Sequence, residues 1–129
     1  MGNEASFMAG SSLAAGVARA GETCGALIGA LMAIGMVAGR KRIEDVDAFQ
    51  SCMELACEVR ERFLESVGHS LCAEIQKILF GRSYRFYDDE DRERFHDDGG
   101  HERTGCPGVC GKAAKIVAEI ILREREKGA

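Results

Sequence analysis

Residues 24–38 read Cys-Gly-Ala-Leu-Ile-Gly-Ala-Leu-Met-Ala-Ile-Gly-Met-Val-Ala, a stretch without charge and rich in small residues. It is somewhat short for a membrane span, which needs about 20 apolar residues. Because it is apolar on nearly all sides, it predicts the central buried helix of the fold and no membrane segment. Gly25 and Gly29 leave room for a neighbouring helix, and we expect a homodimer formed through such glycine-rich helix faces.

The rest of the chain predicts helices around this one, because alternating β-branched runs are missing. We expect helices at residues 4–18, 46–67 and 70–79, and a last helix that begins at Pro107. The 46–67 helix is the clearest, since its apolar residues recur three and four positions apart: Val46, Phe49, Met53, Ala56, Val59, Phe63 and Val67. The prediction is an all-α fold, a compact bundle of four to five helices in a single domain, residues 1–129.

Residues 81–105 are a different kind of sequence, with three aromatic residues followed by runs of charge. They predict a long charged excursion that is solvated and partly helical. A connection of this length inside a compact domain is usually functional or mobile. We interpret His96 and His101 as residues of this solvated loop and not as metal ligands.

Charge and composition exclude some classes of function. The net charge of −4 comes from mixed signs and gives no basic face for nucleic acid. Residues 1–20 have no basic region before the apolar part, so we expect no secretory signal and a cytoplasmic location. In that setting, six cysteines predict reduced, metal-bound or catalytic thiols in place of structural disulfides.

Cys24 and the pair Cys106 and Cys110 lie at two predicted helix starts. If Pro107 is the first helical residue, Cys106 is the N-cap and Cys110 lies one turn further on the same side, so both can bind one metal centre. A helix N-terminus stabilises a thiolate and lowers its pKa. Cys24 has the same setting, and Gly25 beside it allows a bulky inorganic group to approach. The alternative for Cys24 and Cys110 is a small core residue.

The other three cysteines divide into one candidate and two packing residues. Cys72 lies in the first turn of the helix that Ser70 begins, and His69 nearby is interpreted as a capping or surface residue. Cys52 and Cys57 point about 140° apart on a helix, so they cannot serve one centre, and we interpret both as packing. The candidate ligands are therefore Cys24, Cys72, Cys106 and Cys110.

Three blocks of the chain resemble a known family. Residues 21–32 resemble the glycine–cysteine motif of the C_GCAxxG_C_C family of redox-active proteins. Residues 62–72 resemble its second block, in which a helix ends in Phe, then Gly, then an isolated Cys. Residues 106–114 resemble its last cysteine and terminal helix. The family is similar to the cysteine-bearing domain of split-Soret cytochromes and occurs mostly in anaerobic bacteria and archaea.

The resemblance implies a helical domain that holds a redox centre, such as an iron–sulfur cluster, through Cys24, Cys72 and Cys106. The family's leading cysteine lies upstream of the glycine motif, and residues 1–20 contain none, so Cys110 is the obvious substitute. We therefore expect an electron-transfer protein with a cluster bound by these four thiolates beside Gly25 and Gly29, and a redox partner protein.

Two other functions stay open. A structural zinc module would use the same thiolates. A thiol–disulfide protein would act through a low-pKa Cys24 or Cys106. Since no general acid or base is evident, electron transfer is favoured over substrate turnover, and the sequence leaves open whether the protein is an enzyme.

Overall fold

The computed structural model describes residues 3–128, so residues 1, 2 and 129 of the predicted domain lie outside the described part. Within that part there is no β-strand, and a single isolated bridge pairs Thr23 with Leu71. The all-α class is confirmed, with six α-helices in residues 3–128 where four or five were expected. The elements are α1 (Glu4–Gly10), the 3₁₀ turn η1 (Ser11–Leu13), α2 (Gly25–Ala38), α3 (Val46–Val67), α4 (Cys72–Phe80), α5 (Asp89–Asp97) and α6 (Cys106–Lys127).

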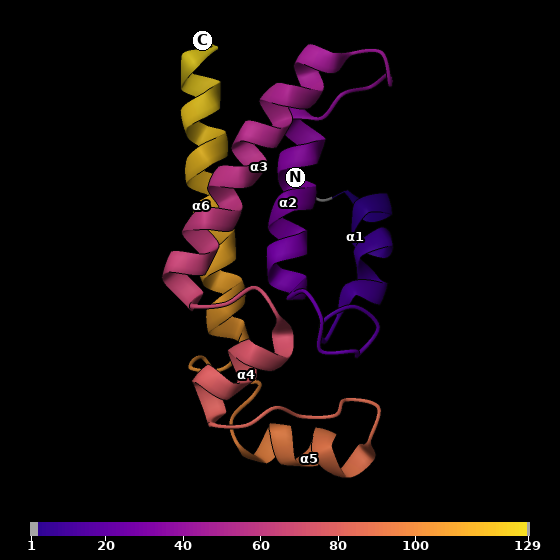
Figure 1. The fold of residues 1–129 in the computed structure, drawn as a ribbon, viewed down its shortest axis with the longest axis vertical. Coiled ribbons are helices and arrows are strands. Elements are labelled where there is room, and N and C mark those ends of the chain that lie inside the picture. The colour runs from indigo at the N-terminus through magenta and orange to yellow at the C-terminus, as the bar shows by residue number, and fades with distance from the viewer. Residues whose placement is uncertain (1–2, 129) are drawn as a thin grey trace.

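Three helices form the core of the fold. α2, α3 and α6 run side by side along the long axis, while α4 and α5 lie at one end of them and α1 lies beside α2 (Figure 1). Their apolar residues recur at helical spacing and meet in one cluster. The fully or nearly buried members are Leu27, Ala30, Ile34, Val59, Phe63, Ile75, Val109, Ala113, Ile116, Val117 and Ile120.

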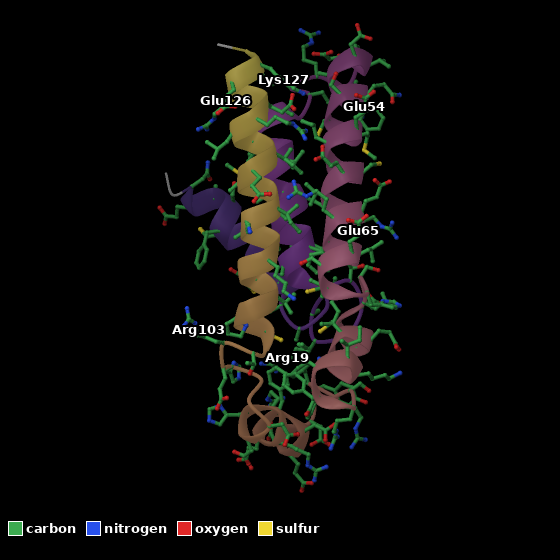
Figure 2. All side chains as sticks on the ribbon, turned by 90° about the vertical axis from the view of Figure 1, so that its left-hand side faces the viewer. Arg19, Glu54, Glu65, Arg103, Glu126 and Lys127 are labelled. Atoms are coloured by element: carbon green, nitrogen blue, oxygen red, sulfur yellow. The ribbon has the colours of Figure 1, made fainter. Side chains whose placement is uncertain are left out.

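Local chemistry sets the ends of the long helices. The Asp45 carboxylate accepts a hydrogen bond from the Ala48 N–H at 3.0 Å and begins α3. Gly68 ends it with a φ of 103°, in the left-handed region that glycine adopts without strain. Gly105 precedes α6, and Pro107 lies in its first turn. Acidic side chains such as Glu54 and Glu65 cover the outer side of α3 (Figure 2).

Part of the predicted face of α3 is wrong. Val46, Phe49 and Met53 are 56%, 37% and 42% exposed. The face that meets the core in this part of the helix carries Cys52 and Leu55 instead. Neighbouring positions on a helix differ by about 100° in direction, so a shift of one residue moves the buried face off the predicted stripe.

The two cysteines of α3 have different outcomes. Cys52 is partly buried against the core cluster, which confirms its packing role. Cys57 is exposed, so the prediction that it packs is wrong. Because the two residues point about 140° apart on the helix, a buried face that includes Cys52 leaves Cys57 on the exposed side.

The first helix is shorter than predicted. α1 ends at Gly10, and every residue from 15 to 19 has a positive φ, between 50° and 74°. A left-handed conformation costs roughly 1–2 kcal/mol for each residue that has a Cβ. Backbone hydrogen bonds offset this cost, among them Glu22 N–H to Gly16 O at 2.9 Å. The local pattern around residue 18 predicted helix, but the turn is stabilised by contacts across the loop.

Residues 81–105 are partly helical, as expected, but the interpretation of this segment as a solvated loop is wrong. It contains α5 and forms a second apolar cluster, in which Tyr84, Phe86 and Phe95 pack with Cys72. Asp91 is only 5% exposed and accepts a hydrogen bond from the Arg85 N–H at 2.8 Å. The segment's own aromatic residues and a satisfied internal carboxylate therefore fold it into an ordered cover over one end of the bundle.

The core assignment can be tested by matched truncations on α3. Phe63→Ala should lower the free energy of unfolding by about 3–5 kcal/mol, because Phe63 is fully buried and its loss leaves a cavity. Phe49→Ala removes the same atoms from a position that is 37% exposed and should cost about 1 kcal/mol, mainly through loss of the cation–π contact with Arg40. Urea denaturation followed by circular dichroism measures both. Equal losses would contradict the assigned face of α3.

Candidate functional site

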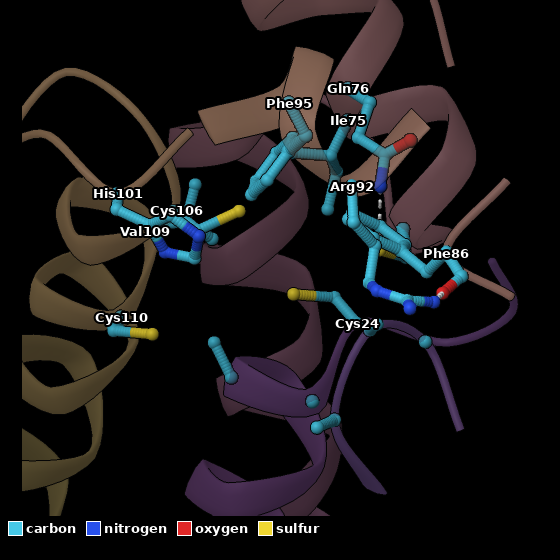
Figure 3. A pocket seen from close by; sticks show the side chains of 16 residues that line it. Cys24, Ile75, Gln76, Phe86, Arg92, Phe95, His101, Cys106, Val109 and Cys110 are labelled. Atoms are coloured by element: carbon cyan, nitrogen blue, oxygen red, sulfur yellow. Dashed lines mark hydrogen bonds between the residues drawn. The ribbon is translucent and has the colours of Figure 1, made fainter. Parts of the chain in front are cut away.

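Four cysteines line one cavity at the end of the bundle that residues 81–105, hereafter the cover segment, lie over. The cavity has a volume of about 410 Å³ and is lined by Cys24, Cys72, Cys106 and Cys110 together with mainly apolar neighbours. Figure 3 shows the sulfur atoms of Cys24, Cys106 and Cys110 pointing into the same space. One water needs roughly 10–15 Å³ on this measure, so the cavity has room for a polyatomic group.

A short backbone pairing fixes two of these residues. The Cys24 N–H donates to Ser70 O at 2.8 Å, and the Cys72 N–H donates to Glu22 O at 2.6 Å. These bonds flank the Thr23–Leu71 bridge. Because side chains alternate along extended backbone, Cys24 and Cys72 both lie on the face opposite to the bridged pair. The pairing thus directs both thiols toward the cavity.

The cavity also lies where three helices begin. Cys24 is the N-cap of α2, Cys72 is the first residue of α4, and Cys106 is the first residue of α6. Cys110 follows one turn later on α6, on the same side as Cys106. Helix N-termini carry partial positive charge and free N–H groups, so this arrangement favours a bound group with negative charge.

Burial governs the ionisation of the thiols. It raises the pKa of Cys72 to about 12 and that of Cys106 to about 11, and repulsion from a Cys24 thiolate acts in the same direction. The pKa of Cys110 is raised for the same two reasons. The low pKa expected for Cys106 is contradicted, because burial raises the pKa of this thiol. A bound cation would favour the thiolate forms, because metal ligands bind as deprotonated sulfur.

The donor set suits two kinds of centre. Four cysteine thiolates are the ligands of iron–sulfur clusters and of many structural zinc ions. Among residues 3–128, however, no three or more His, Cys, Asp or Glu side chains are gathered closely enough to hold a single ion. Zinc needs its sulfur ligands at about 2.3 Å, so the thiols would have to move inward for zinc. The size of the cavity fits a larger group better.

The other predicted site residues lie as follows. Gly25 lines the cavity as predicted. The atom that a Cβ at this position would meet is the backbone oxygen of Leu13, at 2.9 Å, so the lack of a side chain makes room for the chain at residue 13. Gly29 is on a separate groove between α1 and α2. His69 accepts a hydrogen bond from the Leu71 N–H on Nδ1 at 3.0 Å, as a local capping residue would. The structure thus brings the four cysteines and Gly25 together, and leaves Gly29 apart.

Several cavity residues were missed because they belong to the cover segment or gave no signal. Phe86, Arg92, Phe95 and His101 all line the cavity. Arg92 donates to Phe86 O at 2.6 Å, and the His101 ring packs edge-on against Phe95 with ring centroids 5.3 Å apart. The two phenylalanines within a charged segment were the available signal. Gln76, which also lines the cavity, had none in the sequence.

Comparison with known proteins identifies the class. A sequence model of the C_GCAxxG_C_C family, described as "Putative redox-active protein", matches residues 1–120. The chain therefore belongs to this family, which confirms the resemblance. No curated protein and no solved structure matches it. No helix in the described part of the chain is both long and apolar enough to cross a membrane.

The raised thiol pKa values predict a pH dependence of stability in metal-free protein. Folding raises the Cys72 pKa from 9.0 to about 12, so between these values the unfolded chain binds fewer protons than the folded protein. Stability is therefore full below about pH 9 and falls as the pH rises toward 12. Thermal unfolding of the chelator-treated protein from pH 7 to 11 measures this fall.

The contribution of Cys72 is isolated by substitution. Cys72→Ser should flatten the fall, because serine does not titrate in this range. Tyr84, whose pKa burial and Asp98 raise to about 12, contributes equally in both proteins and cancels in the comparison. Cys57→Ser, at an exposed position, should leave the slope unchanged. A Cys72→Ser slope equal to that of the parent would show that Cys72 is not buried in this way.

Proposed function

We propose that this chain is an electron-transfer protein that binds an iron–sulfur cluster through Cys24, Cys72, Cys106 and Cys110. The observation that carries the proposal is that four cysteines from three helix starts line one apolar cavity. Membership of a redox family supports it. When bound, the cluster would supply reversible storage of electrons at a potential that its surroundings set.

The residues of the cavity have separate roles in this proposal. Cys24 and Cys72 are held in position by the backbone pairing, so they form the rigid side of the site. Phe86 and Phe95 exclude water from it, which is one of the factors that set a cluster's potential. Cys110 is the most exposed of the four, so we propose that a redox partner protein docks over its rim.

The proposed setting is a reducing cytoplasm. All six cysteines are free thiols, and three of them line the cavity with partly or fully buried side chains. Thiols of this kind persist where cellular reductants keep disulfides rare.

Anaerobic reconstitution with iron and sulfide tests the proposed function. We expect a coloured protein with visible charge-transfer absorption and bound iron and sulfide. Cys72→Ser should lose most of the colour and iron, because it removes a buried ligand. Cys57→Ser changes an exposed thiol on α3, outside the cavity, and should keep both.

Two results would replace the cluster with another function. A colourless protein with one equivalent of zinc would make the site a structural zinc module. A colourless, metal-free protein with one rapidly alkylated thiol would favour thiol–disulfide chemistry.

We also propose a homodimer, formed through the groove between α1 and α2 that Gly29 and Met36 line. Gly29 is exposed and an added Cβ there would meet nothing within 4 Å, so a second helix has room to approach. Met36 lies two turns later on the same face and is 57% exposed. An apolar helix face of this kind, next to the exposed Phe7 of α1, is suited to a second copy.

The dimer is tested by charge insertion on that face. Met36→Glu should shift the protein to monomer in sedimentation velocity, because association would bury the added charge. Ile78→Glu on α4 is the matched control, since Ile78 is also 57% exposed but lies on another element. A parent protein that is monomeric at the highest concentration measured would contradict the proposal. So would a dimer that Met36→Glu leaves intact.

A further inference from the structure

Gln76 is a buried polar residue in the cavity wall that the proposed function does not use. It lies on α4, one turn after Cys72, and is 1% exposed. Its Nε2 donates to Cys72 Sγ at 3.3 Å, and its Oε1 accepts from the Tyr84 N–H at 2.8 Å. Both ends of the amide are therefore used, one by a candidate ligand and one by the cover segment.

The chemistry of its partners fixes which way the amide faces. The Tyr84 N–H can only donate, so the amide oxygen must face it. The amide NH₂ is then left facing the Cys72 sulfur. Turning the amide over would bring two donors together at Tyr84 and remove the bond to sulfur, and a buried donor without a partner is costly. The N–H···S hydrogen bond is thus enforced by the backbone of the cover segment.

We infer that Gln76 is a positioning residue that raises the reduction potential of the centre through Cys72, an inference that rests on the proposed function. Reduction adds negative charge to a cluster and its thiolates. An N–H dipole whose positive end faces a ligand sulfur stabilises the reduced state more than the oxidised one. Hydrogen bonds to the sulfurs are among the factors that set cluster potentials.

The same amide couples the centre to its cover. Tyr84 is 5% exposed, and its ring packs against Phe95 with ring centroids 5.2 Å apart. Phe95 lines the cavity. The position of the aromatic wall and the hydrogen bond to Cys72 therefore depend on one side chain.

Redox titration of the reconstituted protein tests the inference. Gln76→Leu removes the donor without adding charge, and should shift the midpoint potential to more negative values at unchanged iron content. Gln50→Leu makes the same substitution at an exposed position on α3 and should leave the potential unchanged. An unshifted potential in Gln76→Leu, with the cluster bound, overturns the inference and leaves the proposed function standing. A parent protein that binds no cluster overturns both.

Hydrogen exchange in the metal-free protein provides a readout that needs no cluster. The Tyr84 amide should exchange faster in Gln76→Leu than in the parent, whereas Gln76→Glu keeps the acceptor and should keep the protection. Equal exchange in all three proteins overturns the geometry. If Gln76→Leu does not hold a cluster, Gln76→Met, which also removes the donor without adding charge, takes its place in the titration, and its potential must still fall.

Discussion

The candidate site depends on the backbone pairing between residues 21–24 and 70–73. Three hydrogen bonds make it, from Cys24 to Ser70, from Cys72 to Glu22 and from Ala73 to Gly21 at 3.0 Å. They join the start of α2 to the start of α4, which lie far apart in the sequence. Packing of α2 against α6 in the core places Cys106 and Cys110 near Cys24. The backbone pairing then adds Cys72, so all four cysteines line one cavity.

The left-handed turn at residues 15–19 is the cost of bringing backbone this close to Cys72. A Cβ on Gly16 would lie 2.6 Å from the Cys72 Cβ, so the turn has no space for a side chain there. Its other four residues carry a Cβ and are strained. Such strain is kept only where surrounding contacts determine the conformation, and it tends to occur beside functional sites. Here it lies along one wall of the cysteine cavity.

The sequence predicted correctly those features that neighbouring residues in the chain determine, such as helix ends. The Asp45 cap, Gly68 and the apolar spacing of α6 could all be read from the sequence, and so could the position of the four cysteines at or near helix starts. Which face of α3 is buried could not be predicted, because Met53 and Cys52 are adjacent in the sequence and the apolar spacing favoured the wrong one of the two. The packing of the cover segment was missed because its charge outweighs its aromatic residues in any local average, although Tyr84, Phe86 and Phe95 decide how it packs.

The energetics of the cavity constrain what it can hold. An apolar wall that raises the pKa of Cys72 to about 12 also makes each further thiolate harder to form, since the charge of Cys24 adds to the cost. The helix starts and Gln76 offset part of this cost but supply no full positive charge. Arg92 already bonds Phe86 O and pairs with Asp89, so its charge is partly compensated. A group bound by all four cysteines must therefore bring positive charge of its own and displace protons as it enters.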